Sequence, residues 1–309
     1  MKRFLIARLS AMGDVVCTLP AAVALKRQFP ESEIVWAVDP RFSAIARRCS
    51  AVDTVVEVKP SFHPRTWPRF EGEFDAAFDL QGLTKSGLCL VHAKAKQKLA
   101  YHWCREAARF FSQPVLPDPT SLHIVDQYVD VVRAFGVEAD QAEFGLRPTE
   151  EDLSSAAELL RTTESFVILN GGAGWVTKRW APQSFGKLAD FLKTRGQTAV
   201  LIGGRAPADL AVADEIVAST KAPILNLVGK TSMGALVALI YRAKAHVGGD
   251  TGSTHIAAAL GVPAVGLYGL TRPQRSCPYG QIDRCIHNPA GLSQIGVDDV
   301  IVKVEEAIA

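Results

Sequence analysis

A short apolar strand, a glycine turn and a helix start follow one another in Ala245-His246-Val247-Gly248-Gly249-Asp250-Thr251-Gly252-Ser253-Thr254-His255. The first amides of a helix lack partners inside it, and its positive dipole end favours an anion. The Thr251 and Ser253 hydroxyls add donors, and His255 lies on the same helix face as Thr251. We predict a diphosphate site here, with Asp250 bonded to sugar hydroxyls. The alternative is a helix start that Asp250 or Thr251 simply caps.

The same strand, loop and helix unit repeats along the chain. Predicted strands cover residues 4–9, 33–38, 54–58, 74–80, 166–170, 198–202, 245–247 and 264–267. Predicted helices cover 15–28 (kinked or restarted at Pro20), 41–48, 121–135, 183–194, 208–219, 233–242 and 252–260, with another after residues 81–87. Short apolar runs that alternate with amphipathic helices indicate βαβ units and parallel sheets, so the fold class is α/β.

Chain length and one boundary signal predict two domains. The chain has 309 residues, about twice the length of a typical domain. Pro148 ends the first half, and a Thr-x-x-Asp capping pattern opens a helix at Thr149. We therefore expect two Rossmann-like domains, residues 1–148 and 149–309, facing each other across a ligand-binding cleft. The last helix is a candidate to pack back on the N-terminal domain.

Composition excludes several classes of protein. Hydrophobic residues make up 48% and charged residues 21% of the chain, as in soluble globular proteins. A net charge of +2 gives no reason to expect nucleic acid as a partner. The six cysteines form no C-x-x-C pair, so we expect reduced thiols. The first apolar run is broken by Arg8 and no segment reaches ~18 apolar residues, so we expect a cytoplasmic protein that can still contact a membrane surface.

Two further loops lie between a predicted strand and a helix. In Met12-Gly13-Asp14 the carboxylate of Asp14 is either a helix cap or a general base. The glycine-rich loop 171–174 leads to Lys178 and Arg179, which supply cations for phosphate. This loop matches neither G-x-G-x-x-G nor a P-loop, and a solvated basic turn is an equal alternative.

Basic residues gather in two places in the first half. Lys59, Arg65 and Arg69 lie in a loop rich in proline and aromatic residues. The second group follows the loop of Lys85 and comprises Lys94, Lys96, Lys98, Arg105 and Arg109. Such runs are either solvated faces or an acceptor site for a polyanion.

Four motifs in this order and spacing resemble the ADP-heptose:lipopolysaccharide heptosyltransferases, glycosyltransferase family 9. They are Met12-Gly13-Asp14-Val15, Asp79-Leu80-Gln81-Gly82-Leu83-Thr84-Lys85-Ser86, Lys178-Arg179-Trp180 and Asp250-Thr251-Gly252-Ser253-Thr254-His255. The resemblance implies the GT-B fold and an inverting transfer of L-glycero-D-manno-heptose from ADP-heptose to the lipopolysaccharide inner core. It also implies a place at the cytoplasmic face of the inner membrane, as a peripheral protein.

The second motif resembles heptosyltransferase I, which acts on the first Kdo of Kdo2-lipid A. The loop 170–175 and the Lys-Arg-Trp motif are nearer the second enzyme, so a heptosyltransferase II-like acceptor stays open. Within the same class, another sugar nucleotide or acceptor is an alternative. An NAD-dependent dehydrogenase is a rival from another class, although G-x-G-x-x-G with a later acidic residue is missing. A non-catalytic nucleotide-sugar binder, in which Asp14 would be dispensable, is a third alternative.

The resemblance also implies roles for single residues. Asp14 would be the catalytic base and Lys178 a ligand of the donor phosphate. The rest of the donor site would comprise Asp250, Thr251, Gly252 and His255 for diphosphate and heptose, and Asp209 for the adenosine ribose. The acceptor site would comprise Arg105, Lys85, Lys59, Arg65 and Arg69. With cations for the diphosphate and no D-x-D pair, we expect no obligatory metal or other cofactor.

Overall fold

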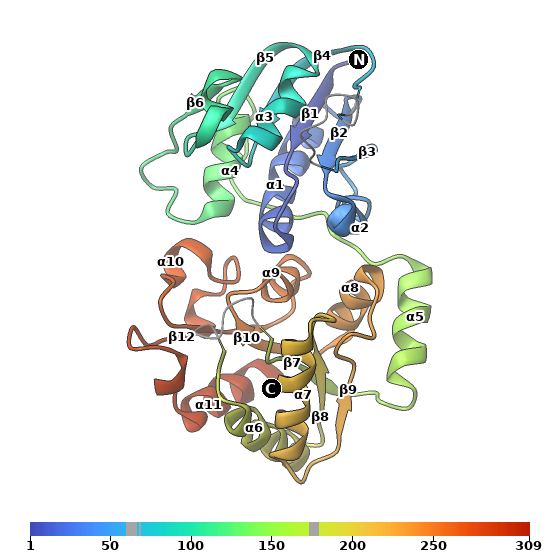
Figure 1. The fold of residues 1–309 in the computed structure, drawn as a ribbon, viewed down its shortest axis with the longest axis vertical. Helices are drawn as coiled ribbons and strands as arrows, with labels where there is room; N and C mark the ends of the chain where they lie inside the picture. Colours follow the sequence, from blue (N-terminus) through green and yellow to red (C-terminus); the bar gives the residue numbers. More distant parts are fainter. Residues whose placement is uncertain (60–66, 68, 173–178) are drawn as a thin grey trace. The chain divides into compact units, whose positions relative to one another are not determined.

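The computed structural model describes residues 1–59, 67, 69–172 and 179–309 (Figure 1). Lys178 and Arg65, both predicted site residues, lie outside these ranges. The chain divides into two compact units, Met1–Arg147 and Pro148–Ala309. The division falls one residue before the boundary expected from the sequence. The expected capping pattern is present, because the Asp152 amide donates to Thr149 Oγ1 at 3.2 Å and the Thr149 amide to Asp152 Oδ2 at 2.9 Å.

The N-terminal unit is a six-stranded parallel sheet with the order β3-β2-β1-β4-β5-β6. Its elements are β1 (Arg3–Ala7), α1 (Met12–Gln28), β2 (Glu33–Val38), η1 (Pro40–Phe42), α2 (Ser43–Ala46), β3 (Thr54–Glu57), β4 (Glu73–Asp79), α3 (Thr84–Val91), β5 (Lys94–Tyr101), η3 (Glu106–Phe110), β6 (Gln113–Val115) and α4 (Ile124–Arg133). Helix α1 continues through Pro20, where the sequence predicted a kink or restart.

Helices cover both faces of this sheet, which explains the uninterrupted apolar run of β1. The ring of Phe4 contacts Phe29 and Phe135 on the face where α1 packs against α4. Leu5 belongs to a core cluster on the other face that includes Leu90 of α3. Parallel strands buried on both faces lose the polar alternation of a half-exposed strand. The carboxyl ends of β1 and β4 are thereby held side by side.

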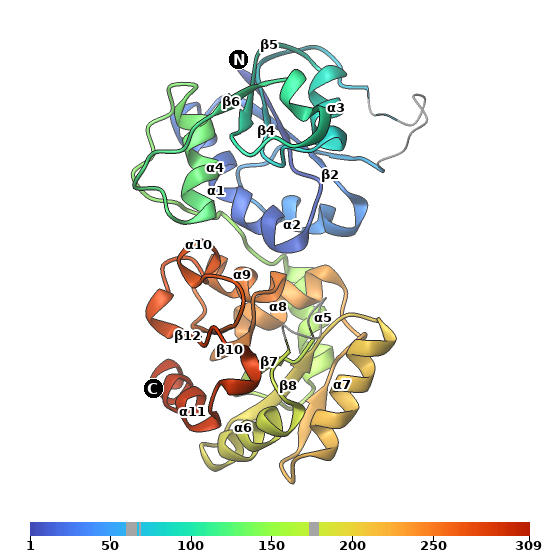
Figure 2. The ribbon, with the colours of Figure 1, turned by 60° about the vertical axis from the view of Figure 1, so that its left-hand side comes forward.

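The C-terminal unit repeats this architecture with the sheet order β12-β11-β10-β7-β8-β9 (Figure 2). Its elements are α5 (Glu150–Leu160), β7 (Phe166–Asn170), α6 (Pro182–Thr194), β8 (Thr198–Ile202), α7 (Pro207–Ala218), β9 (Ile224–Asn226), α8 (Met233–Arg242), β10 (Ala245–Gly249), α9 (Gly252–Ala259), β11 (Ala264–Tyr268), α10 (Pro273–Ser276), η5 (Ile282–Arg284), β12 (Cys285–His287), η6 (Leu292–Gln294) and α11 (Val297–Ile308). Counted within its unit, each sheet has the Rossmann order 3-2-1-4-5-6.

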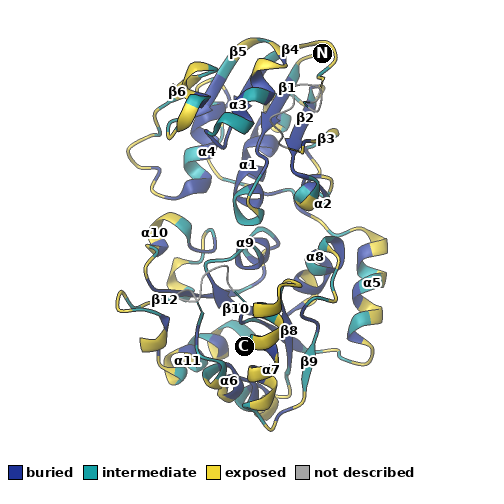
Figure 3. Cartoon of the chain, in the orientation of Figure 1, coloured by how far each residue is buried: buried dark blue, intermediate teal, exposed yellow. Residues whose placement is uncertain are grey.

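The last helix, α11, packs within the C-terminal unit. It contacts α6, β10 and β11, and its Val300 and Val304 are fully buried in that core. Figure 3 shows how buried and exposed residues are distributed along the chain. The indole of Trp180 donates to the Ile295 carbonyl at 3.0 Å, just before the helix begins. The apolar face of α11 is thus used within its own unit, and packing of this helix on the N-terminal domain stays a prediction.

Four strands were not predicted, and β5 is the instructive one. It runs through the basic group that includes Lys94 and Lys96. Lys96 pairs with Asp75 of β4 at 2.8 Å, and Lys94 lies 3.8 Å from Glu73. These lysines are exposed on β5 and neutralise acidic residues of the neighbouring strand β4. The other three strands, β6, β9 and β12, have only three residues each, too few to show a period.

No helix within the described ranges is long and apolar enough to cross a membrane.

Candidate active site

Polar residues gather in each unit where the strand order reverses. In the N-terminal unit this switch point lies between β1 and β4, and in the C-terminal unit between β7 and β10. Crossover helices leave in opposite directions there, so the carboxyl ends of the two strands open into a crevice suited to ligands. Each unit therefore has one place at which its fold favours a ligand.

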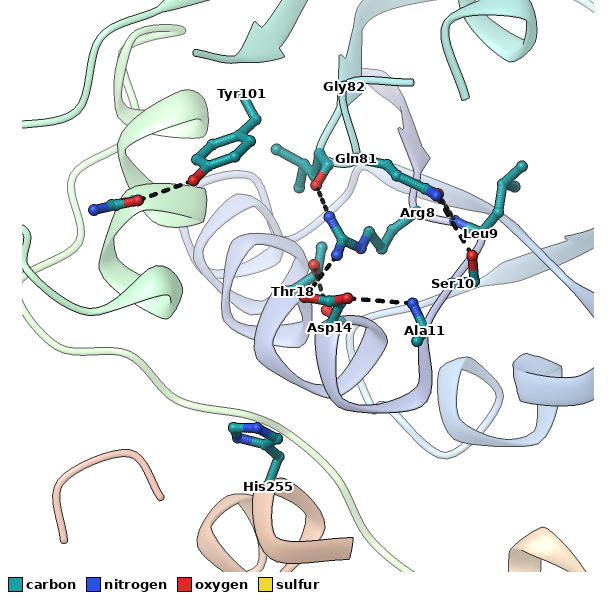
Figure 4. Close-up of polar contacts among 12 residues, drawn as sticks. Arg8, Leu9, Ser10, Ala11, Asp14, Thr18, Gln81, Gly82, Tyr101 and His255 are labelled. Atoms are coloured by element: carbon teal, nitrogen blue, oxygen red, sulfur yellow. Dashed lines mark hydrogen bonds and ion pairs between the residues drawn. The ribbon is translucent and has the colours of Figure 1, made fainter. Parts of the chain in front are cut away.

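An ion pair occupies the N-terminal switch point (Figure 4). The Arg8 side chain is 6% exposed, and its Nη2 atom lies 2.8 Å from Asp14 Oδ1. It also donates to the Leu80 carbonyl and lies 5.0 Å from the centre of the Tyr128 ring. Burial acts to lower the pKa of Arg8, but contacts with Tyr128 and Asp14 outweigh burial and raise that pKa. Arg8 is thus a permanent buried cation that holds one oxygen of Asp14.

Asp14 lies at the third position of α1 rather than at its cap. Its Oδ2 accepts the Ala11 amide at 3.3 Å, so the carboxylate reaches back over the helix start. The Asp14 side chain is 44% exposed, so solvent or a ligand can reach it. The two readings of the sequence are compatible: Asp14 helps to close the helix start, and it remains an oriented, accessible carboxylate.

The motif that follows β4 holds the loop after β1 in place through hydrogen bonds. Gln81 accepts the Leu9 amide at 2.9 Å through Oε1 and donates to Ser10 Oγ at 3.4 Å. Lys85 donates to the same Ser10 oxygen at 3.0 Å. Lys85, predicted to bind the acceptor, therefore lies at the switch point, where it contacts the loop that leads to Asp14.

Asp79 and Gly82 position the loop that carries Arg105. The fully buried Asp79 accepts the amides of Gln81 and Gly82 at 3.0 and 2.9 Å, and burial raises the pKa of this carboxyl group. Gly82 has a φ of +71°, and a Cβ there would lie 2.7 Å from the Trp103 carbonyl oxygen. Its own carbonyl accepts the Arg105 amide at 2.8 Å. The exposed Arg105 guanidinium stacks 5.5 Å from the Trp103 ring centre.

Two other predicted acceptor residues, Lys59 and Arg69, lie on other parts of the sheet. Lys59 is exposed and follows β3, the edge strand two places from β1. Arg69 precedes β4, and the neighbouring Phe70 packs on Phe74 near the amino end of that strand. Asp14 lies at the opposite, carboxyl edge. The structure therefore places Arg69 toward the amino edge of the sheet, away from Asp14, and its role as an acceptor ligand stays a prediction.

The C-terminal switch point is lined by hydroxyl groups. The Asn170 amide, at the end of β7, donates to Thr251 Oγ1 at 3.2 Å and to Ser253 Oγ at 2.7 Å. Thr254 donates to the Gly249 carbonyl at 2.7 Å. Thr251 is the N-cap residue of α9, but its side chain does not cap the helix. Capping alone therefore does not account for these hydroxyls.

Two histidines flank this cluster. His255 Nε2 lies 3.4 Å from Asp250 Oδ1, and both side chains are largely buried. His246 is fully buried, and its Nε2 lies 2.9 Å from Ser253 Oγ. Burial first, and His255 second, lower the pKa of His246 to about 3. The imidazole of His246 is therefore neutral at physiological pH.

Asp209 connects two loops of the same unit. It lies in the first turn of α7, 3.4 Å from Arg179 Nη2, and its second oxygen accepts the Gly204 amide at 3.2 Å. A small hollow beside it is lined by Gly172 and Gly203. Asp209, the residue predicted to bind the ribose, thus lies by the ends of β7 and β8, close to Gly172 and Arg179.

Several residues of these sites escaped sequence reasoning. Arg8 was noticed only as a break in an apolar run, although a lone arginine inside a buried strand signals a paired charge. Asn170 and His246 carried no motif of their own. Within the described ranges, no three His, Cys, Asp or Glu side chains cluster in a way that could hold a metal ion.

Two parallel sheets of Rossmann order, each with a polar switch point, define the GT-B class of glycosyltransferase fold. The model of glycosyltransferase family 9 (heptosyltransferase) matches residues 68–295, and the chain belongs to this family. It is therefore a glycosyltransferase, as its motifs predicted, and the dehydrogenase and non-catalytic alternatives are excluded.

Relatives agree with this family assignment. The chain is 23% identical over 291 residues to the lipopolysaccharide core heptosyltransferase OpsX of Haemophilus influenzae, covering 92% of this chain and 84% of the relative. It is 28% identical over 302 residues to lipopolysaccharide heptosyltransferase 1 of Pseudomonas aeruginosa, covering 90% and 82%. The solved structure of E. coli heptosyltransferase WaaC with ADP matches with a TM-score of 0.81 at 24% identity over 99% of each chain.

Proposed function

We propose that this enzyme transfers L-glycero-D-manno-heptose from ADP-heptose to a Kdo of Kdo2-lipid A during assembly of the lipopolysaccharide inner core. The observation that carries the proposal is the start of α9, where hydroxyls and free amides meet and no acidic residue occupies the first turn. Such a helix start favours a diphosphate. The family, and relatives named as lipopolysaccharide heptosyltransferases, support the sugar and the pathway.

On the donor side, Thr251 and Gly252 would hold the diphosphate through a hydroxyl and first-turn amides. Asp250 and His255 would bond the heptose hydroxyls, and Asp209 the adenosine ribose. Lys178, outside the described residues, would neutralise the departing ADP together with the helix dipole. In this assignment the C-terminal unit, Pro148–Ala309, binds the donor, and the N-terminal unit, Met1–Arg147, binds the acceptor.

On the acceptor side, Asp14 would act as the general base. As an acceptor hydroxyl attacks the anomeric carbon, its proton passes to the carboxylate. The new carbon–oxygen bond forms on the face opposite the leaving group, and the bond to ADP breaks with its electron pair on the phosphate oxygen. Configuration at the anomeric carbon is therefore inverted. Arg8 supports this role because it occupies one oxygen of Asp14 and leaves the carboxylate oriented and 44% exposed.

The acceptor is an anionic lipid, which the exposed cations of the N-terminal unit favour. Lys85 lies beside Ser10, and Arg105 projects from the loop fixed by Gly82. Lys59, which is exposed after β3, would be an outer contact of the acceptor, as would Arg65 and Arg69 of the following sequence. The choice of heptosyltransferase I over a II-like enzyme rests on the motif that contains Gln81 and Lys85.

Exposed aromatic side chains beside arginines suit a peripheral place on the cytoplasmic face of the inner membrane. Trp103 is 50% and Phe110 73% exposed, and Arg105 and Arg109 stack on them. Aromatic rings favour the membrane interface and arginines favour anionic headgroups. The protein should sediment with phosphatidylglycerol vesicles, and Trp103→Ala should weaken this. Equal sedimentation with neutral phosphatidylcholine vesicles would contradict the proposed role of the arginines.

The decisive experiment is mass spectrometry of Kdo2-lipid A incubated with ADP-heptose and the protein. We expect the mass of one heptose to be added, and EDTA to leave the yield unchanged because protein cations bind the diphosphate. Heptosyl-Kdo2-lipid A serves as a second acceptor. Transfer to that acceptor alone would instead assign a II-like enzyme, and transfer to neither would reject the proposal. UDP- and GDP-sugars in place of ADP-heptose test the choice of nucleotide.

A further inference from the structure

His246 is a buried polar residue that the proposed reaction does not use. Its ring is fully buried below the start of α9, with Nε2 2.9 Å from Ser253 Oγ. Nδ1 is buried without a hydrogen-bond partner in the described part of the chain. A Cβ at Gly248 would lie 3.0 Å from His246 Cε1, so a side chain there would crowd the ring. The imidazole is therefore fixed with one nitrogen on a hydroxyl.

The neighbouring amide of Asn170 sets the direction of the surrounding hydrogen bonds. The Gly172 N–H can only donate, and it lies 3.0 Å from Asn170 Oδ1. Nδ2 must therefore be the atom that faces the hydroxyls, and it donates one hydrogen to Ser253 and one to Thr251. Each hydroxyl thus has one lone pair occupied from the side of β7.

The proton of the neutral His246 ring is best placed on Nε2. If it were on Nδ1, a buried N–H would have no acceptor, and orphaned buried N–H groups are rarer than under-satisfied acceptors. With the proton on Nε2, the ring donates to Ser253 Oγ, and the nitrogen without a partner is only an unused lone pair. Ser253 Oγ then accepts from both His246 and Asn170.

The proton of Ser253 is consequently directed outward. Ser253 is only 1% exposed, and the acceptor left to it is Thr251 Oγ1 at 3.2 Å. Thr251, which is partly exposed, then accepts from both Asn170 and Ser253. Thr254 gives its own proton to the Gly249 carbonyl and lies 3.2 Å from Thr251 Oγ1. Among the described residues, Thr254 Oγ1 is the acceptor left to the Thr251 proton, which otherwise points to solvent or to a ligand.

We infer that His246 is a positioning residue that acts through Ser253 to fix the Thr251 hydroxyl as a donor to an anionic oxygen of the sugar-nucleotide diphosphate. The inference rests on the proposed function for the identity of the ligand. A chain of donors that begins in the core gives the site its preference for an anion, because successive hydrogen bonds polarise one another. The specific consequence is that His246 tunes donor binding without touching the donor.

The first test is nitrogen-15 NMR of histidine-labelled protein, with His246→Gln to assign the signal. We expect a neutral His246 with its proton on Nε2, both free and in the presence of ADP. A proton on Nδ1, or a doubly protonated ring, would overturn the inference. This readout requires neither catalysis nor ADP binding, so it stands apart from the proposed function.

The second test is the affinity for ADP measured by calorimetry. Loss of one polarised donor should weaken ADP binding by roughly three- to tenfold in His246→Leu. His246→Gln, which keeps an N–H donor, should restore most of it, and His287→Leu in the same unit is the matched control. Ser253→Ala removes one oxygen atom and should weaken ADP binding as much as His246→Leu does. The double variant should bind ADP no more weakly than either single variant.

Unchanged ADP affinity in both His246→Leu and Ser253→Ala, or additive losses in the double variant, would overturn the relay. If the wild-type protein itself does not bind ADP, the proposed donor is wrong, and the position of the His246 proton then decides the inference alone.

Discussion

The two switch points of this enzyme share a fold and differ in what occupies the helix that begins there. In the N-terminal unit, Asp14 stands in the first turn of α1 and pairs with the buried Arg8. In the C-terminal unit, the first turn of α9 has no acidic residue and is lined by hydroxyls. A helix start already neutralised by its own carboxylate has little affinity left for an anion, whereas a neutral one retains it.

The comparison shows how one architecture, used twice, can provide two different functions. The sheet order places a loop at the same point in both units, and one side chain decides what that point can bind. In the proposed mechanism, the carboxylate of the N-terminal unit takes up a proton, and the hydroxyl groups of the C-terminal unit bind phosphate.

The largest effect is expected from Asp14→Asn. Loss of a positioned general base lowers kcat by roughly 10²–10⁴-fold, because the amide cannot take the acceptor proton. The rate of heptose transfer under saturating substrates measures this. Asp126→Asn, in the first turn of α4 in the same unit, is the matched control and should keep the wild-type rate. A kcat within twofold of wild type for Asp14→Asn would remove the carboxylate from the mechanism.

Arg8→Met should come next, because it releases one oxygen of Asp14. A misplaced catalytic group can cost up to about 10²-fold in rate, and we expect a loss of roughly 10- to 100-fold in kcat with little change in donor KM. Arg8→Lys, which keeps the charge, should recover part of the rate. If Arg8→Met altered donor KM and spared kcat, Arg8 would belong to binding rather than to the base.

In the C-terminal unit, the buried His246 should make the stability of the protein depend on pH. Its folded pKa of about 3 lies below the ordinary value of 6.5. As the pH falls through this window, the unfolded chain takes up a proton that the folded chain refuses, so stability is lost. The share from this group is about 1.4 kcal/mol per pH unit. Urea unfolding between pH 7.5 and 5 should show a shallower loss in His246→Gln, and parallel curves would contradict the shifted pKa.

The smallest effect is expected on the KM for the acceptor, which should respond differently to changes at two lysines of the N-terminal unit. Lys85→Ala should raise the KM for the acceptor severalfold, because Lys85 lies at the switch point beside Ser10. Lys96→Ala should leave that KM unchanged, because Lys96 is paired with Asp75 on β5. Steady-state kinetics with Kdo2-lipid A compares the two variants. Equal effects would mean that the acceptor is attracted by overall charge rather than by the switch point.

Much of this architecture could be predicted from the sequence, since buried parallel strands are apolar throughout and their helices are amphipathic. The runs Phe4–Ala7 and Phe166–Leu169 needed no tertiary information to be recognised. Strand β5 was missed although its lysines follow the period of two of a strand, because the acidic residues of β4 that balance them come next to them only in the sheet. Very short edge strands leave too few residues for a pattern.

For the sites, the sequence indicated the residues that stand in motifs but not those that orient them. Asp14 and Thr251 follow strands and open helices, and this position alone marks them. Arg8, Asn170 and His246 act through contacts between strands that are far apart in the chain, so their role depends on the sheet order. Arg69 shows a further limit, because closeness in sequence to Lys59 does not tell at which edge of the sheet a residue lies.

The most direct test of the division between the two switch points is the dissociation constant of ADP in Asp14→Asn and Thr251→Val, measured by calorimetry beside the wild-type protein. We predict an unchanged constant in Asp14→Asn and one raised by about tenfold or more in Thr251→Val, since a hydrogen bond to a charged group is lost. Two results would contradict this division of roles. One is that Asp14→Asn weakens ADP binding as much as Thr251→Val does, and the other is that Thr251→Val does not weaken ADP binding.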